Sequence, residues 1–451
     1  MMRGRWTFLL AVVGVGLSAD GVMGQVQPTY RADVDGAVSG WVTSHLDATV
    51  ALYKRLHANP ELSLHEVNTA ATVARSLEQA GYVVTTGVGG TGVVGVLSHG
   101  KGPTVLIRGD MDALPVTENT GVPYASRAQS TRADGVSVGV MHACGHDVHV
   151  SNLIATAQLL AELSDRWRGT VLIVAQPAEE LGRGAAMMIE DGLFERFARP
   201  DVCISLHVSH ELPAGRVGYT PGWASANVDS VDITVFGRGG HGARPNEAVD
   251  PVVAAAHLVT NLQTLVSRRV NPIEPAVVTV GSIHGGSKHN IIADEVKLQM
   301  TVRSYTDEVR QQLLEGIRQI AVDTCRTYLC PKPPKVTVLN EHTPAAYNDP
   351  DLTRATAELF VKVLGADNVV EMPPTMGGED FGRFSKKLGV PGLQFQLGAV
   401  DQATYQASLA PDGPALPSLH SAKFAPAPEP TLRTGIATLA HLALGLLEPA
   451  G

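Results

Sequence analysis

The chain lacks several features that would assign it to a specialised class of protein. Its 451 residues include 35 Lys and Arg against 44 Asp and Glu, so the formal net charge is −9. No basic stripe or tail stands out, and we therefore expect no nucleic-acid partner. No internal repeat is visible, so a repeat architecture is not expected. A chain of this length and ordinary composition can form two or three domains with a large core.

The chain also lacks a stable membrane span at its N-terminus, because the apolar run Trp6–Leu17 is too short to cross a bilayer as a helix. Arg3 and Arg5 precede this run, and small residues up to Gly24 offer a cleavage site. We expect residues 1–24 to be the signal peptide of an exported protein, periplasmic or secreted. An uncleaved anchor is the alternative.

Cysteine is scarce, with four residues in the whole chain. An exported protein of this size does not need a disulfide framework. Cys203 lies in an apolar run, and we expect it to be a buried free thiol. Cys325 and Cys330 could pair if the expected helix ends between them, because side chains five apart on a continuous helix are too distant. The sequence leaves this pairing open.

What the chain does contain is a concentration of metal-binding side chains at Met141–His149. Three histidines, one cysteine and one aspartate fall within these nine residues, and such ligands suit zinc, manganese or cobalt. Cys144 and His146 are two apart, so in an extended segment both can face one metal ion. An apolar, helix-like run follows, which places the cluster where a loop enters a helix. Taken singly, His142 and His149 are interpreted as residues that support a ligand or lie at the start of the helix. For the cluster as a whole, the alternative is a group of ordinary surface or capping histidines.

The order of the expected elements indicates the fold class. Short apolar strands such as Val171–Ala175 are typical of a sheet that is covered on both faces. A βαββαβ order between Val228 and Leu339 fits a compact ferredoxin-like module. We therefore expect an α/β fold in which a central mixed sheet is interrupted by an inserted ferredoxin-like α+β lid or dimerisation domain. The expected limits are a signal peptide at 1–24, a catalytic domain at 30–222 and 342–450, and the inserted domain at 223–341.

One glycine-rich segment matches the dinucleotide-binding pattern G-x-G-x-x-G. A Rossmann loop must open a helix, whereas Gly87–Gly92 leads into the apolar strand-like residues Val93–Leu97. We therefore interpret the segment as a hairpin. A nicotinamide-dependent oxidoreductase, which rests on this segment alone, is the weakest functional alternative.

Side chains that can bind metal recur after the expected strands. An open α/β sheet places its ligand-binding site at the carboxyl ends of its strands. Asp112 follows the strand that ends at Arg108, and His207 follows the strand that begins at Asp201. Glu179 and Glu180 follow another strand and suggest a division of labour. One glutamate can bind metal while the other remains free as a general base. Two ordinary surface glutamates are the alternative.

These residues resemble a family of dinuclear metal-dependent amidohydrolases and exopeptidases that includes aminoacylase, hippurate hydrolase and the plant auxin-conjugate hydrolases. The resemblance is greatest to the hippurate-hydrolase-like branch, and it covers nearly all of the chain after the signal segment. Seven motifs occur in the order expected of the family, namely Arg108–Pro115, Met141–His149, Gln176–Glu180, Gly239–Ala243, Asn290–Glu295, Gly377–Phe381 and Leu419–His420.

The resemblance implies a set of metal ligands and catalytic groups. Glu179 would be the base that activates water and then protonates the leaving amine, and Asp112 would orient a ligand imidazole. His241 would reach the site of a neighbouring subunit and stabilise the oxyanion. Asn290 and Arg303 would bind the carbonyl or free carboxylate of the substrate. Two divalent metal ions per subunit (zinc, manganese or cobalt) would be held by Cys144, His146, Glu180, His207 and His420.

We therefore expect a homodimer or higher homo-oligomer that hydrolyses the amide bond of small N-acyl amino acids. A carboxypeptidase or dipeptidase that cleaves small peptides is the alternative within the enzyme class. A catalytically inactive ligand-binding protein of the same fold is the alternative outside it, although a binding protein has no need of a free base beside its metal ligand. The chain departs from the family in its longer polar loop Ser126–Gly139 and in His289, and both departures concern substrate specificity.

Overall fold

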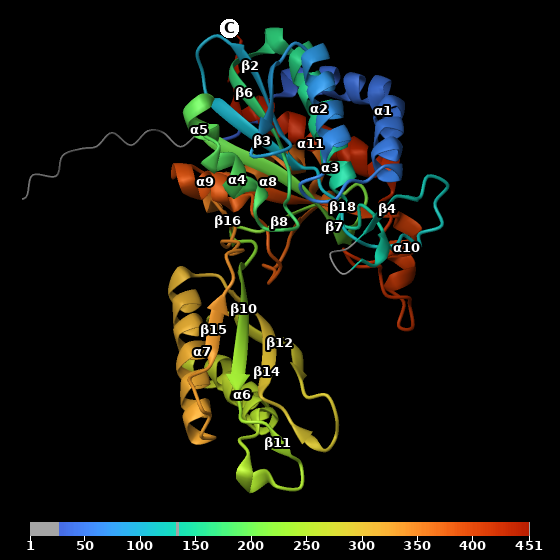
Figure 1. The fold of residues 1–451 in the computed structure, drawn as a ribbon. Coiled ribbons are helices and arrows are strands. Elements are labelled where there is room, and N and C mark those ends of the chain that lie inside the picture. Colours follow the sequence, from blue (N-terminus) through green and yellow to red (C-terminus); the bar gives the residue numbers. More distant parts are fainter. Residues whose placement is uncertain (1–26, 132–134, 451) are drawn as a thin grey trace, which may run out of the picture.

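The computed structural model describes residues 27–131 and 135–450, which form two bodies (Figure 1). The signal peptide expected at 1–24 lies outside the described residues. Within the described ranges, no helix is both long and apolar enough to cross a membrane. We call the larger body the large domain and the smaller body the inserted domain.

The large domain is built on a nine-stranded mixed sheet. The strands in its centre are parallel to one another, and antiparallel pairs occur on both sides of this centre. In spatial order they are β1 (Val83–Val88), β2 (Gly92–His99), β6 (Trp167–Gln176), β3 (Thr104–Asp110), β7 (Val202–Pro213), β18 (Gly392–Val400), β8 (Val217–Tyr219) and β17 (Val369–Glu371), with β19 (Glu448–Pro449) paired to β6.

Helices cover both faces of this sheet, so that its central strands are buried on both sides. Val105 and Ile107 of β3 point into one apolar core, and Leu106 between them points into the other, as the two-residue period of a strand requires. The first core is covered by α1 (Asp35–Ala58), α2 (Val67–Gln79), α3 (His146–Glu162), α8 (Pro350–Leu364) and α11 (Pro428–Leu446), and the second by α4 (Gly184–Glu190), α5 (Leu193–Arg196) and α9 (Gly382–Leu388).

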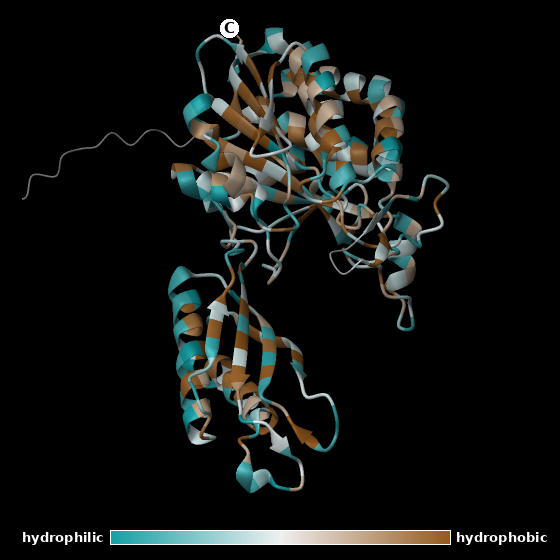
Figure 2. Cartoon of the chain, in the orientation of Figure 1, coloured by the Kyte–Doolittle hydropathy of each residue, from teal (hydrophilic) through white to brown (hydrophobic). Residues whose placement is uncertain are grey.

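The inserted domain has a core of its own. Its antiparallel sheet buries alternate residues of each central strand, such as Val231 and Ile233, and this alternation is visible as coloured bands in Figure 2. The domain follows the expected βαββαβ order, and the predicted α/β fold class with a mixed central sheet is confirmed. Its elements are β10 (Asn227–Phe236), α6 (Pro251–Thr264), β12 (Ala276–Gly285), β14 (Glu295–Ser304), α7 (Asp307–Thr327) and β15 (Lys335–Val338), and the limits 223 and 341 stay predictions.

The glycine-rich segment forms a hairpin, as predicted. Strands β1 and β2 pair antiparallel, and Val88 faces Gly92 across the turn. Gly89 and Gly90 adopt positive φ angles of 64° and 106°, which glycine tolerates and other residues rarely do. No helix follows the turn, so the structural basis for a dinucleotide-binding loop is absent at this segment.

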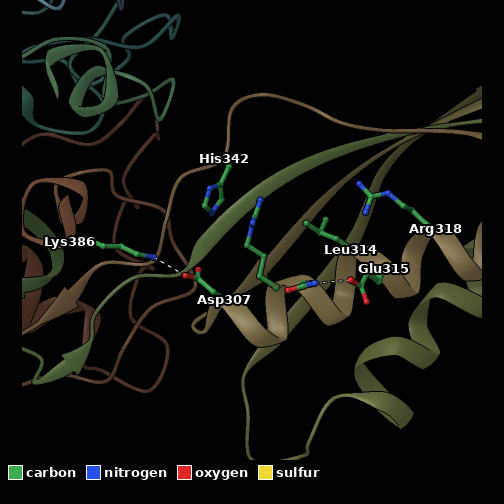
Figure 3. A pocket seen from close by; sticks show the side chains of 8 residues that line it. Asp307, Leu314, Glu315, Arg318, His342 and Lys386 are labelled. Carbon is green, nitrogen blue, oxygen red and sulfur yellow. Dashed lines mark hydrogen bonds and ion pairs between the residues drawn. The ribbon is translucent and has the colours of Figure 1, made fainter. Parts of the chain in front are cut away.

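The two domains meet where the chain crosses between them. Lys386 of α9 contacts Asp307 at the start of α7, with 3.0 Å between nitrogen and oxygen (Figure 3). Arg310 of α7 donates two hydrogen bonds to Asp229 of β10, at 2.7 and 2.6 Å. Lys386, Asp307 and Arg310 line a hollow of about 410 Å³ between α7 and the large domain. Among the described residues, none of the candidate metal-binding groups lies in this hollow.

Arg108 of β3 links segments of the large domain that are far apart in the sequence. Its side chain is fully buried, and its nitrogens lie 2.6 Å from Asp110, 2.9 Å from Glu379 and 3.2 Å from Asp380. Its Nε also donates to the Gln176 side chain of β6 at 2.9 Å. The guanidinium therefore offsets the charge of acidic groups that come both before and after the inserted domain.

We predict that Arg108→Met lowers the free energy of unfolding by about 3–5 kcal/mol, because it leaves buried carboxylates without their cation. Urea unfolding followed by circular dichroism measures the change. The control is Arg354→Met, which removes an exposed pair with Asp351 at 3.4 Å and should change stability by less than about 0.5 kcal/mol. Equal effects of the two substitutions would contradict the role given to Arg108.

Candidate active site

The histidine–cysteine cluster lies at the start of α3, as predicted. His146 is the first residue of the helix, and Gly145 before it has a φ of 77°. A Cβ atom at Gly145 would lie 2.5 Å from a methyl group of Val208, which is too close for any other residue. The glycine therefore allows Cys144 and His146 to approach β7.

Asp112 holds the two glutamates and a histidine in position. Its buried carboxylate accepts the backbone N–H groups of Glu179 at 3.1 Å and Glu180 at 3.0 Å. Its Oδ1 lies 3.3 Å from Nδ1 of His146, so the Nε2 of that imidazole faces away from Asp112. The turn that presents the glutamates contains Ala178, whose φ is +49°. This geometry is that of a carboxylate that orients metal-binding groups.

Four of the five side chains expected to bind metal line one cavity, and the fifth, His146, is buried beside them. Sγ of Cys144 lies 3.6 Å from Nε2 of His207, and Nε2 of His420 lies 3.5 Å from Oε2 of Glu180. Nε2 of His146 is 3.9 Å from Oε1 of Glu180. The ligand atoms form three overlapping groups, which are Cys144, His146 and His207; Cys144, Glu180 and His420; and His146, Glu179 and Glu180. The cavity has a volume of about 590 Å³, a size that suits a small ligand.

His207 reaches this cavity from within a strand, not from its end. We expected the strand to stop before His207, but β7 continues to Pro213 because β18 pairs alongside it as far as that residue. Nδ1 of His207 lies 2.8 Å from the backbone oxygen of Val208. A proton on Nδ1 would leave Nε2 free to bind a metal ion.

The electrostatics of the cluster fit a divalent cation. Burial raises the pKa of the Cys144 thiol well above its usual value, and nearby Glu180 and Glu179 raise it further. Burial likewise raises the pKa of Glu180 to about 7 and that of Glu179 well above its usual value. Burial opposes the charged form of His146, yet Asp110 and Asp112 raise its pKa to about 10. Burial and the neighbouring carboxylates thus oppose the charged forms of Cys144, Glu179 and Glu180, and a bound cation would favour them.

Two buried atoms also indicate that the cluster fits a divalent cation. Within the described part of the chain, Nε2 of His146 and Oε1 of Glu180 have no hydrogen-bond partner. Buried polar atoms normally have one, and a metal ion bound to both would satisfy them. The donor set of one thiolate, three imidazoles and a carboxylate suits zinc, manganese or cobalt.

His149 supports the site without facing the cavity. Its Nδ1 lies 2.5 Å from Asp110, and its Nε2 accepts the backbone N–H of Val208 at 2.9 Å. Both ring nitrogens are therefore occupied, which agrees with the interpretation of His149 as a supporting residue. His142 is also buried, and burial lowers its pKa to about 4.

Sequence reasoning assigned no role to Glu379, although it recognised the motif Gly377–Phe381. Glu379 is buried, lines the cavity, and accepts hydrogen bonds from Arg108 at 2.9 Å and Gln394 at 2.7 Å. Its carboxylate lies within 4.8 Å of that of Glu179. The only signal in the sequence was the acidic pair that follows the two glycines of this motif.

A second residue missed by sequence reasoning is His57, at the end of α1. Its Nδ1 lies 2.6 Å from Asp147, which follows His146, and its Nε2 lies 3.1 Å from Glu118. Burial opposes the charge, but the two carboxylates raise the pKa of His57 to about 10. The loop after Glu118 is joined to the segment of His420 through the hydrogen bond from Asn119 N–H to Ala422 O at 2.7 Å. His57 therefore connects α1 with two segments that carry expected metal ligands.

The residues expected to bind substrate are divided between the two ends of the inserted domain. Arg303 of β14 lines the cavity and donates to the backbone oxygen of Met376 at 2.8 Å. His241 is exposed on β11 (Gly240–His241), which lies at the tip of the inserted domain farthest from the large domain (Figure 1). Asn290 is exposed beside it, and its backbone oxygen accepts from Gly242 at 2.9 Å. A single chain therefore does not bring His241 or Asn290 to the cavity.

Comparison with known proteins identifies the family. The model of peptidase family M20/M25/M40 matches residues 106–443. The chain belongs to this family. The M20 protein is 39% identical to a probable hydrolase of Synechocystis, over 78% of this chain and 86% of the relative. It is 35% identical to thermostable carboxypeptidase 2 of Saccharolobus solfataricus over 89% and 95%, and 35% identical to N-acetyl-L-cysteine deacetylase of Bacillus subtilis over 74% and 76%.

Solved structures agree with this assignment. A putative aminohydrolase from methicillin-resistant Staphylococcus aureus shares 33% identity at a TM-score of 0.78, over 92% of this chain and all of that one. A dinuclear metal-binding M20 peptidase of Bacillus subtilis shares 28% identity at a TM-score of 0.71, over 90% and 99%. The M20 protein is thus a hydrolase that acts on amide or peptide bonds, and the predicted family and enzyme class are confirmed.

We predict that Cys144→Ser weakens metal binding by more than about tenfold, because loss even of a residue that supports a ligand commonly weakens binding by that factor. Dialysis against limiting zinc followed by mass spectrometry of the metal content measures the effect. Cys330→Ser is the matched control, since Cys330 lies outside the cavity and outside the metal-type clusters. Unchanged metal content in Cys144→Ser would remove Cys144 from the ligand set.

Proposed function

We propose that the protein hydrolyses the amide bond of N-acyl amino acids with two divalent metal ions per subunit and Glu179 as the general base. The observation that carries this proposal is the arrangement of two adjacent glutamates on one turn. Asp112 binds both backbone N–H groups. Both glutamates group with His146, but only Glu180 also groups with Cys144 and His420. Glu179 lines the same cavity and would remain free to move a proton.

The proposed metal ligands are the five residues expected from the sequence. When bound, the ions would polarise the amide carbonyl and lower the pKa of the attacking water. Glu179 then takes the proton of the water and returns it to the leaving amine. Asp112 holds the turn of the two glutamates and the ring of His146 in place for this transfer. The ligands are Cys144, His146, Glu180, His207 and His420.

Arg303 is the residue that we propose to bind the free carboxylate of the substrate. It lines the cavity from the inserted domain, and a guanidinium binds a carboxylate through two parallel hydrogen bonds. The 35% identity with a relative named as a deacetylase of N-acetyl-L-cysteine supports an acylated amino acid as substrate. A terminal carboxylate is also present on peptides, and a relative named as a carboxypeptidase is equally similar. Peptide cleavage is therefore the second candidate function.

We also propose that the site is completed across a homodimer or higher homo-oligomer. His241 and Asn290 lie on the tip of the inserted domain that is remote from the cavity of their own chain. Both are exposed, so a neighbouring subunit can reach them. From that subunit His241 would stabilise the oxyanion of the transition state, and Asn290 would bind the carbonyl. Export to the periplasm or outside the cell belongs to the same proposal and rests on the signal segment at 1–24.

The decisive experiment measures amine release from N-acyl amino acids and from dipeptides, with the enzyme reloaded in turn with zinc, manganese and cobalt. We predict release from the acylated amino acids, and a fall of about 10²–10⁴-fold in Glu179→Gln, because that change removes the proton-transferring group. Metal content should stay at the wild-type level.

The control for this experiment is Glu211→Gln, the same substitution at an exposed glutamate that lines the same cavity. It should retain most of the activity. Release from dipeptides alone would move the assignment to a peptidase. Metal-loaded protein that releases amine from neither substrate class would favour a ligand-binding protein, and near wild-type activity in Glu179→Gln would refute the base.

The cross-subunit role makes a separate prediction. Glu179→Gln and His241→Ala should each be inactive alone but regain activity when co-expressed. In a mixed dimer, the subunit with Glu179 receives His241 from its partner, so random pairing should restore about one quarter of wild-type activity. The double variant expressed alone is the control and should stay inactive. If the mixture gains no activity, His241 acts within its own chain or has no role in catalysis.

A further inference from the structure

The end of α7 brings two cysteines together. The helix stops at Thr327, and Leu329 adopts a left-handed conformation with φ of +56°. The backbone N–H of Cys330 donates to the oxygen of Cys325 at 2.9 Å, and that of Leu329 donates to Arg326 at 3.2 Å. These two hydrogen bonds define a Schellman motif, in which the chain folds back over the last helical turn.

This motif places Cys325 and Cys330 at the two positions whose side chains usually meet in an apolar contact. Cys325 is 3% exposed in the core of the inserted domain, and the half-buried Cys330 packs against the same core. Burial and the contact with the Cys330 thiol together raise the pKa of Cys325 to about 12. Both cysteines are thiols in the structure, and both pack against the same core at the end of the helix.

We propose that Cys325 and Cys330 are a disulfide-forming pair that closes a covalent ring over the end of α7. The oxidant is a second disulfide, of a small molecule or of a protein thiol oxidoreductase. Cys330 is the more exposed thiol, so its sulfur attacks the oxidant first and forms a mixed disulfide, with release of one thiol. Cys325 then loses its proton and attacks the sulfur of Cys330, which releases the second thiol. Two electrons and two protons pass to the former disulfide.

The disulfide would act on the inserted domain and not on the reaction. Neither cysteine lines the cavity, so the rate of hydrolysis should be unchanged by oxidation. The six-residue ring fixes the turn that leads from α7 to β15, and a cross-link stabilises a fold mainly by restricting the unfolded chain. Oxidised protein should therefore melt several degrees above the reduced protein.

Metal-loaded wild-type protein treated with oxidised glutathione, then blocked and digested with trypsin, tests the proposal. Trypsin cuts between the two cysteines at Arg326, so oxidation should yield peptides 319–326 and 327–335 joined by a bond that reduction breaks. Cys203, which is fully buried, should remain a thiol and serves as the internal control.

Single substitutions test the order of the two steps. Cys325→Ser should keep one glutathione on Cys330, because the second attack is lost. Cys330→Ser should take up no glutathione at the buried Cys325, and its melting temperature should not respond to the oxidant. A wild-type protein that retains glutathione on Cys330, or that yields no joined peptides, would overturn the proposal.

Discussion

The buried positive charge of Arg108 is the constraint on which the rest of the large domain depends. A guanidinium without exposure to water must be paired, and it is shared by Asp110 on one side of the inserted domain and by Glu379 and Asp380 on the other. The pairing fixes two segments separated by about 270 residues against the same end of β3. The same pairing keeps the carboxylate of Glu379 within 4.8 Å of that of Glu179. The buried charge of Arg108 therefore also affects the electrostatics of the cavity.

Around this centre, three segments that carry expected ligands are held by partners from elsewhere in the chain. Asp112 holds the turn of Glu179 and Glu180, and the backbone oxygen of Ala143 accepts the N–H of His420 at 2.8 Å. His57 contributes from α1 by holding the residue after His146. Because most of these partners are themselves buried and hydrogen-bonded, the fold itself keeps these side chains close to one another.

The features that could be predicted from the sequence are those that depend on local spacing. The two-residue interval between Cys144 and His146, the paired glutamates after an apolar strand, and the glycine hairpin were all recognisable because neighbours in the chain carry the signal. Glu379 and His57 could not be assigned in this way, since their partners lie far along the chain and nothing local separates them from surface residues. The end of β7 was misplaced for the same reason, because its length is set by pairing with β18.

The connection between the two domains has a consequence for how such a protein could arise and be rebuilt. Val228 and Thr343 pair as neighbours, with backbone hydrogen bonds of 2.8 and 3.0 Å, so the inserted domain leaves and rejoins the large domain at almost the same place. Insertions whose ends lie close together disturb the host fold little. The inserted domain therefore replaces a short connection between two neighbouring segments, and it has a core of its own. It is a module that could be exchanged between relatives while the sheet below keeps its strand order.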